Sequence, residues 1–143
     1  MSDGRFVDTN VLLRYFLRDH PEQFQAARLT IENITDPSDY LRVSPSTISE
    51  YVFVALGPLY KRTRAEIAES VAAILGGPFD VTERETVGQA VALYRDVHDD
   101  WDDCLLAAYA LEQGDGSVVS FDRGLDRIPG LTRVEPTVPA ANG

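Results

Sequence analysis

The chain has 143 residues, a length typical of one domain, and 44% of them are hydrophobic, enough to bury a core. A disordered chain is therefore excluded. No apolar run approaches the roughly 18 residues needed to cross a membrane, and the start of the chain lacks the apolar stretch of a signal peptide. A single cysteine, Cys104, and two widely separated histidines exclude a disulfide scaffold and a zinc finger. We expect a soluble, cytoplasmic protein with no membrane attachment.

The chain is acidic, with 23 acidic against 13 basic residues and a net charge of −10. Lys61 is the only lysine, so nearly all positive charge is carried by arginine. This balance excludes a broad, non-specific phosphate-binding surface. Most of the acids are expected to form a solvated surface, typical of a GC-rich or salt-adapted host.

Hydrophobic periodicity and turn residues predict strands that alternate with helices. We expect capping boxes, which are typical of helix starts, at Thr47 with Glu50, Thr63 with Glu66 and Thr82 with Glu85. In chain order, the expected elements are a strand at Arg5–Asp8, helices at Val11–Arg18 and Glu22–Ile34, a strand at Tyr40–Ser44, helices at Thr47–Leu56 and Thr63–Leu75, a strand at Phe79–Val81, helices at Thr82–Val97 and Trp101–Gln113, and strands at Val118–Phe121 and Thr132–Glu135.

Alternation of this kind indicates parallel strands joined by right-handed crossovers. The predicted fold class is α/β, a three-layer α/β/α sandwich around a central, mainly parallel sheet. The helix Trp101–Gln113 is apolar nearly all round, which favours burial against the sheet. We expect a single domain over residues 1–135 and a loose tail over residues 136–143.

Two acids follow short apolar strands. Asp8 closes the first predicted strand and Asp122 follows the strand Val118–Phe121. Open parallel sheets bind ligands at the carboxyl ends of their strands, so both positions are candidates for a site. Each acid could equally cap the helix or turn that follows it, and Asn10 could cap the first helix in place of Asp8.

A third acid comes from the cluster Asp99–Asp103. Helical spacing places Asp103 on a stripe with apolar residues, so it should point inward, whereas Asp102 should face solvent and Asp99 or Asp100 should cap the helix. The fourth acid is Glu50, which lines up with apolar residues but could also complete its capping box.

Four converging carboxylates would repel one another. Two like charges about 4 Å apart cost roughly 4 kcal/mol at an effective dielectric near 20, so such a cluster must hold protons or bind cations. Oxygen ligands without histidine or cysteine select Mg²⁺, with Mn²⁺ as the alternative ion. Such an ion activates water and neutralises charge on a phosphodiester, which indicates phosphoryl hydrolysis.

Four motifs occur in an order that resembles the PIN-domain family, and more narrowly the VapC-type toxins of prokaryotic toxin–antitoxin pairs. The resemblance spans nearly the whole chain. It is carried by Phe6–Arg14 (FVDTNVLLR), Ser49-Glu50, Asp103–Ala108 (DCLLAA) and Val118–Arg123 (VVSFDR), followed by Ile128–Leu131 (IPGL).

The resemblance implies a Mg²⁺-dependent endoribonuclease whose products carry 5′-phosphate and 3′-hydroxyl ends. Its acidic quartet maps onto Asp8, Glu50, Asp103 and Asp122, with Asp8 and Asp103 as the principal metal ligands. The other two acids would complete the site or orient the attacking water. The side chains of Asn10 and Ser120 would hydrogen-bond to the carboxylates without contacting the metal ion. Asp126, one helical turn after Asp122, is the alternative fourth acid.

The resemblance also implies an RNA substrate, a homodimer and a small antitoxin whose carboxyl-terminal segment lies across the active-site groove. Seven apolar residues are candidates for the antitoxin contacts, although their pattern favours ordinary core packing: Leu12, Leu13, Phe16, Tyr51, Val54, Leu59 and Tyr60. Because the chain is acidic, RNA would need a local basic rim. Two i, i+4 pairs flank the proposed site, Arg14 with Arg18 and Arg123 with Arg127.

Two other functions remain to be weighed. A receiver-like phosphoacceptor would require a lysine at a late strand end, and Lys61 lies elsewhere. A catalytically inactive PIN-like module that binds RNA or protein is the second alternative, which the four acids disfavour. We assign no chemistry to His20, His98 or Cys104, and expect Cys104 to be a small buried residue.

Overall fold

The computed structural model describes residues 4–140. Its regular elements alternate between helices and short strands, as the sequence predicts. In chain order they are α1 (Thr9–Leu17), α2 (Pro21–Glu32), the 3-10 turn η1 (Pro37–Asp39), β1 (Leu41–Val43), α3 (Pro45–Leu56), α4 (Arg64–Gly76), β2 (Phe79–Val81), α5 (Arg84–Asp96), α6 (Trp101–Gln113), β3 (Ser117–Val119), the 3-10 turn η2 (Arg123–Arg127) and β4 (Thr132–Val134).

The described strands are parallel and form two pairs. β1 pairs with β2 with Arg42 opposite Asp80, and β3 pairs with β4 with Val118 opposite Arg133. The first predicted strand is reduced to a parallel bridge between Phe6 and Arg42, next to β1. The α/β class with parallel strands is confirmed, and the described strands are divided between two parts of the molecule.

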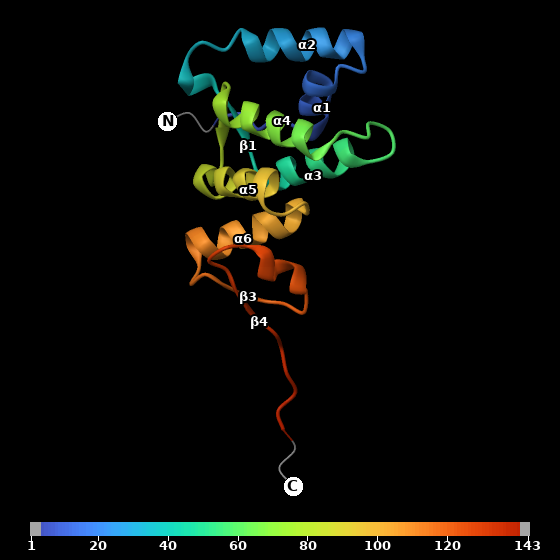
Figure 1. Ribbon diagram of the computed structural model, residues 1–143. Coiled ribbons are helices and arrows are strands. Elements are labelled where there is room, and N and C mark those ends of the chain that lie inside the picture. Colours follow the sequence, from blue (N-terminus) through green and yellow to red (C-terminus); the bar gives the residue numbers. More distant parts are fainter. Residues whose placement is uncertain (1–3, 141–143) are drawn as a thin grey trace.

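Figure 1 shows how this division arises. The helices follow one another across the molecule from α2 to α6, and the β3–β4 pair lies beyond α6, away from β1. Apolar side chains near the unpaired edges are consequently exposed, with 60% exposure at Phe6, 70% at Val119 and 72% at Phe121. Residues 136–140 have no regular structure and run away from the body, while residues 141–143 of the predicted tail lie outside the described chain.

The N-caps of α3, α4 and α5 can be compared with the capping boxes expected from the sequence. Thr63 and Glu66 form the predicted reciprocal capping box at α4. The box expected at α5 is wrong, because Glu83 is the N-cap in a left-handed conformation and no side chain caps the helix. α3 begins earlier than predicted, with Ser44 as its N-cap and proline in the first turn, where a missing N–H costs nothing.

The core is built mainly from the faces of α3 to α6. α6 is buried through small residues, with Cys104, Ala107 and Ala108 fully inaccessible to solvent. Small side chains let α5 and β3 approach the helix closely, so one face of α6 is buried as expected, whereas Leu106 on its other face is 47% exposed. Trp101 fixes its first turn by donating a hydrogen bond from Nε1 to Ser49 Oγ on α3 at 3.0 Å.

Among the described residues, no helix is both long enough and apolar enough to cross a membrane.

We predict that Thr63→Ala lowers the free energy of unfolding by about 1 kcal/mol, because it removes the hydroxyl that accepts from the Glu66 amide. Urea denaturation measures this loss. Thr82→Ala is the matched control, since the capping box expected there does not form, and its effect should stay below about 0.5 kcal/mol. Equal losses in the two variants would contradict this assignment.

Cys104 should be chemically inert in the folded protein. Burial, together with the nearby charges of Asp100 and Asp103, raises the pKa of the Cys104 thiol to about 12, and the thiolate is the reactive form. We predict negligible reaction with iodoacetamide at pH 8 in the native protein and full reaction in denaturant. Mass spectrometry reads out both states, and rapid labelling of the folded protein would refute the assignment.

Candidate functional site

Asp8 lies directly before α1 and is its N-cap. Its Oδ2 accepts a hydrogen bond from the backbone N–H of Asn10 at 3.3 Å, so the capping role considered from the sequence is real. The side chain is exposed, and Oδ1 accepts no hydrogen bond from the described residues. Asp8 can therefore cap the helix and still offer an oxygen to a cation.

Glu50 lies on α3, where it is exposed. The capping role considered for it is wrong, because the helix begins at Pro45 and Ser44 caps it. Its expected apolar stripe is also not buried, since Phe53 is 79% exposed. Instead, Glu50 Oε2 accepts a hydrogen bond from Thr9 Oγ1 at 3.0 Å, which joins α3 to the start of α1.

Asp103 lies in the first turn of α6, and its side chain is 24% exposed. It points inward relative to the exposed Asp102, as helical spacing predicts. Asp100 caps the helix by accepting from the Asp103 amide at 2.9 Å. Oδ2 of Asp103 lies 3.0 Å from Nε2 of His98, a buried histidine to which the sequence analysis assigned no chemistry.

Asp122 caps the turn η2, with Oδ1 accepting from the Gly124 amide at 2.8 Å. The turn lies close to His98, because a methyl group added at Gly124 would lie 3.5 Å from His98 Cε1 and 3.0 Å from Asp122 Oδ1. Asp103 and Asp122 thus lie on two elements that meet at one histidine.

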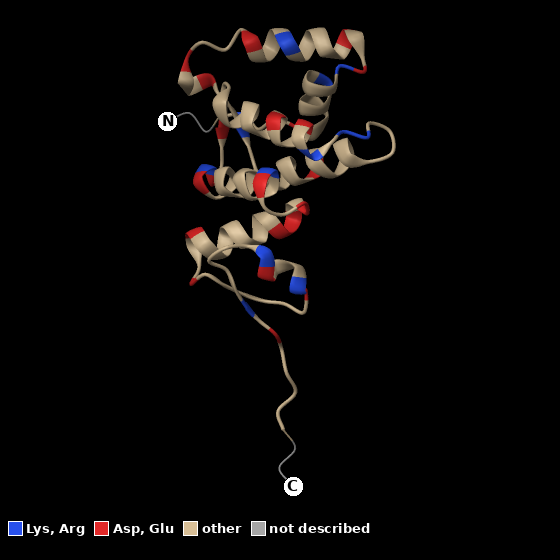
Figure 2. Ribbon diagram, viewed as in Figure 1, with Lys and Arg blue, Asp and Glu red and all other residues tan. Residues whose placement is uncertain are grey.

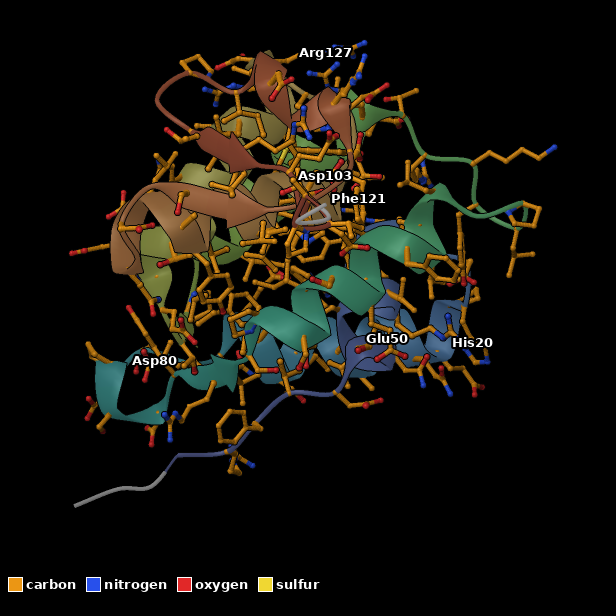
Figure 3. The ribbon with its side chains drawn as sticks, turned by 90° about the horizontal axis from the view of Figure 1, so that it is seen from below. His20, Glu50, Asp80, Asp103, Phe121 and Arg127 are labelled. Carbon is orange, nitrogen blue, oxygen red and sulfur yellow. The ribbon has the colours of Figure 1, made fainter. Side chains whose placement is uncertain are left out.

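The four acids therefore lie in two pairs. Thr9 stands between Asp8 and Glu50, and His98 stands between Asp103 and the turn of Asp122. Figure 3 shows Glu50 on α3 well apart from Asp103. Over residues 4–140, no three histidine, cysteine, aspartate or glutamate side chains form a group that could hold a metal ion.

The expected supporting contacts differ from those observed. Asn10 contributes its backbone amide to Asp8, and Ser120 Oγ accepts from the Asp122 amide at 2.9 Å, so neither side chain holds a carboxylate. Thr9 and His98 make those contacts in their place. Thr9 could have been identified from its position beside Asp8, whereas no sequence pattern marks His98 as a neighbour of Asp103.

Arg14 is held within the protein and does not form a free basic rim. Its guanidinium bonds to Gln23 at 2.7 Å and to Asp19 at 3.3 Å, and Tyr60 O–H donates to Asp19 at 2.6 Å. The hydrogen bond from Tyr60, together with the positive charge of Arg14, lowers the pKa of Asp19. These hydrogen bonds connect α1 to α2 and to the loop before α4.

The other proposed basic residues differ in their surroundings. Arg18 stacks over the ring of Phe24 at 4.9 Å. Arg123 and Arg127 are exposed on η2 and form no ion pair or hydrogen bond with other described residues. In Figure 2 this turn carries blue segments next to red ones.

Asp126, the alternative fourth acid, contacts the last strand. Its carboxylate pairs with Arg133 Nε at 2.9 Å, and Arg133 also reaches Glu135 at 3.1 Å. These contacts attach η2 to β4, so Asp126 is engaged on the side of the turn that faces the last strand.

The apolar residues considered as antitoxin contacts fall into three groups. Leu12, Leu13 and Tyr51 are buried and belong to the core, whereas Leu59 is 81% exposed. Phe16, Val54 and Tyr60 are partly buried against the core.

His20 has a structural role, since its Nδ1 accepts a hydrogen bond from the Gln23 amide and caps α2.

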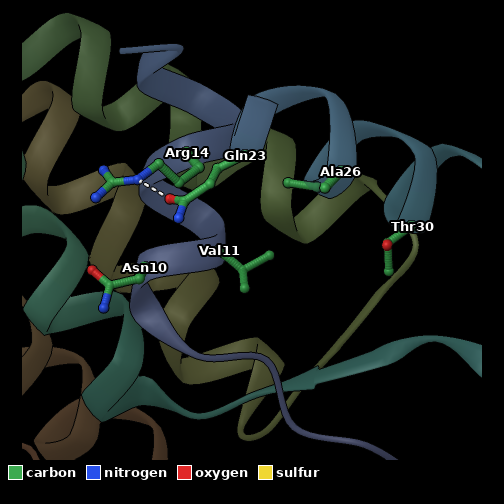
Figure 4. A pocket seen from close by; sticks show the side chains of 7 residues that line it. Asn10, Val11, Arg14, Gln23, Ala26 and Thr30 are labelled. Carbon is green, nitrogen blue, oxygen red and sulfur yellow. Dashed lines mark hydrogen bonds between the residues drawn. The ribbon is translucent and has the colours of Figure 1, made fainter. Parts of the chain in front are cut away.

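A pocket of about 350 Å³ lies between α1 and α2. Figure 4 shows its lining, in which Arg14 and Gln23 bond to each other while Val11, Ala26 and Thr30 line the space beside them. The pocket reaches Asn10, close to Asp8, so it opens beside one half of the acid set.

The donor set fits a hard divalent cation in its chemistry. All four candidate ligands are carboxylates, and each has one oxygen in a hydrogen bond with a neighbouring residue while its second oxygen is left to a cation. Their division into two pairs means that an ion could use all four only where both pairs face it.

Comparison with known proteins agrees with this arrangement of motifs. The PIN domain model matches residues 5–131. The chain is 31% identical over 133 residues to a VapC ribonuclease of Aquifex aeolicus (strain VF5), covering 92% of this chain and 96% of that protein. The chain therefore belongs to the PIN-domain family and is of the VapC type.

Proposed function

We propose that the protein is a metal-dependent endoribonuclease and the toxin of a toxin–antitoxin pair. The proposal rests mainly on Asp103, a half-buried carboxylate in the first turn of α6. One of its oxygens lies within hydrogen-bond distance of His98, and the other is left to bind a metal ion. The likeness to a VapC ribonuclease along 92% of the chain supports the same function.

Asp8, Glu50, Asp103 and Asp122 would hold the ion, which we propose to be Mg²⁺, with Mn²⁺ as a substitute. A bound divalent ion supplies an activated water and neutralises charge on the phosphodiester. The chain's own residues provide orientation: Thr9 fixes Glu50 and His98 fixes Asp103. Hydrolysis would leave 5′-phosphate and 3′-hydroxyl ends.

The proposed partners are RNA, a second copy of the chain and a small antitoxin, all acting in the cytoplasm. The pocket between α1 and α2 suits an apolar antitoxin segment, since Val11, Ala26 and Ala27 line it and it opens close to Asp8. An antitoxin bound there would cover one half of the acid set.

A second candidate function is an inactive PIN-like module that only binds RNA or protein. The separation of the four acids into two pairs, with no group of three among residues 4–140, favours this alternative. The cleavage experiment below distinguishes the two functions.

We predict that the purified protein cleaves a structured RNA pool with Mg²⁺ or Mn²⁺ and loses cleavage in EDTA. Asp103→Asn should lower the rate by at least about 100-fold, the scale typical of removing one group that stabilises transition-state charge. Asp102→Asn is the matched control, because this adjacent carboxylate faces solvent. Absence of cleavage by folded, antitoxin-free protein would favour the binding module.

Arg123→Ala and Arg127→Ala should weaken RNA binding without unfolding the protein. RNA affinity is measured in the Asp103→Asn background, so that cleavage does not interfere. Each substitution should reduce the slope of log affinity against log salt by about 0.7–1, as expected for one lost phosphate contact. Arg28→Ala, on the exposed face of α2, should leave the slope unchanged. An equal change in all three variants would refute a basic rim on η2.

A further inference from the structure

We propose that His98 is a positioning residue for Asp103 and links it to the turn that carries Asp122. The inference rests on the proposed function, because it assigns the role of His98 to the acids that would hold the ion. It extends that function to a histidine outside the acidic quartet.

The first observation is the hydrogen bond itself. Nε2 of His98 lies 3.0 Å from Oδ2 of Asp103. An ionised carboxylate can only accept hydrogen bonds, so Nε2 is the donor in this contact whenever Asp103 is ionised. The bond occupies Oδ2 and fixes the rotation of the carboxylate, which leaves Oδ1 to face a ligand.

The second observation is how firmly the ring is held. The His98 side chain is only 6% exposed. Its backbone N–H donates to Leu93 O at 2.9 Å, and its carbonyl accepts from Cys104 Sγ at 3.3 Å. The backbone of His98 is thus attached to α5 on one side and to α6 on the other, while burial restricts the ring. A donor fixed in this way can hold Asp103 in one orientation.

The third observation concerns the second ring nitrogen. Nδ1 of His98 is buried and has no hydrogen-bond partner among the described residues. A buried polar atom without a partner disfavours folding, so this ring is a poor choice for core packing alone. The ring position is explained by what Nε2 and Cε1 touch, namely Asp103 and the turn at Gly124.

The contact with Gly124 extends the argument to Asp122. A methyl group at Gly124 would be 3.5 Å from His98 Cε1, so the ring lies against the backbone of the turn. The same turn is closed by Asp122 Oδ1 bonding to the Gly124 amide at 2.8 Å. His98 therefore sets the spacing between the two acid-bearing elements as well as the orientation of Asp103.

The test compares His98→Gln with His98→Asn and His98→Leu. The terminal nitrogen of glutamine can occupy the position of Nε2 and donate to Asp103, whereas that of asparagine corresponds to Nδ1 and cannot reach it. Leucine fills the space with no donor. A role in packing alone would not make glutamine superior to both other variants.

The first readout is Mn²⁺ affinity, measured by electron paramagnetic resonance on the RNA-free protein. Removing a residue that hydrogen-bonds to a metal ligand typically lowers metal affinity or activity by about 10- to 100-fold. We therefore expect losses of Mn²⁺ affinity of that size in His98→Leu and His98→Asn. His98→Gln should stay within about threefold of the wild type on the same scale. The second readout is the Mg²⁺ concentration that gives half-maximal cleavage, which should shift in the same order.

Thermal unfolding of each variant shows whether it is folded. Folded His98→Leu protein with wild-type Mn²⁺ affinity would overturn the inference, as would equal losses in the glutamine and leucine variants. If leucine fails to fold, the comparison of glutamine with asparagine decides. Failure of the proposed function looks different, because the wild-type protein would then cleave no RNA whatever residue 98 is.

Discussion

The burial of α6 is the constraint on which the candidate site depends. Its small residues Cys104, Ala107 and Ala108 let α5 and β3 pack closely on either side. Trp101 ties the first turn to Ser49 on α3, one residue before Glu50. The same turn carries Asp103, so the packing of the helix decides which acids can approach one another. A larger side chain at the buried alanines would displace this turn.

Each half of the acid set has one hydrogen-bonding residue, Thr9 or His98, next to its carboxylates. Thr9 donates to Glu50 and is next to Asp8, and His98 donates to Asp103 and touches the turn of Asp122. Donors of this kind stabilise carboxylates that would otherwise repel their neighbours. The strand segments that precede Asp8 and Asp122 lie in different pairs, because Phe6 bridges to β1 while β3 pairs only with β4 among the described strands.

Much of the fold could be predicted from local signals in the sequence. The bounds of α6 and β2 and the capping box at Thr63 are as predicted, because they depend on short-range periodicity and turn chemistry. The motifs also identified the family. Long-range contacts could not be predicted: Glu50 bonds to Thr9 from 41 positions away, and the separation of β3 from β1 has no local signature. His98 was missed because a lone histidine carries no pattern.

We propose that the two pairs of acids serve one divalent ion. The most direct measurement is Mn²⁺ titration of the wild type, Asp8→Asn and Asp103→Asn by electron paramagnetic resonance, with Asp102→Asn as control. One substitution comes from each pair. Both substitutions should weaken binding of the same Mn²⁺ ion, whereas the control substitution should not. Loss of binding in only one of the two variants, or in neither, would contradict a shared site.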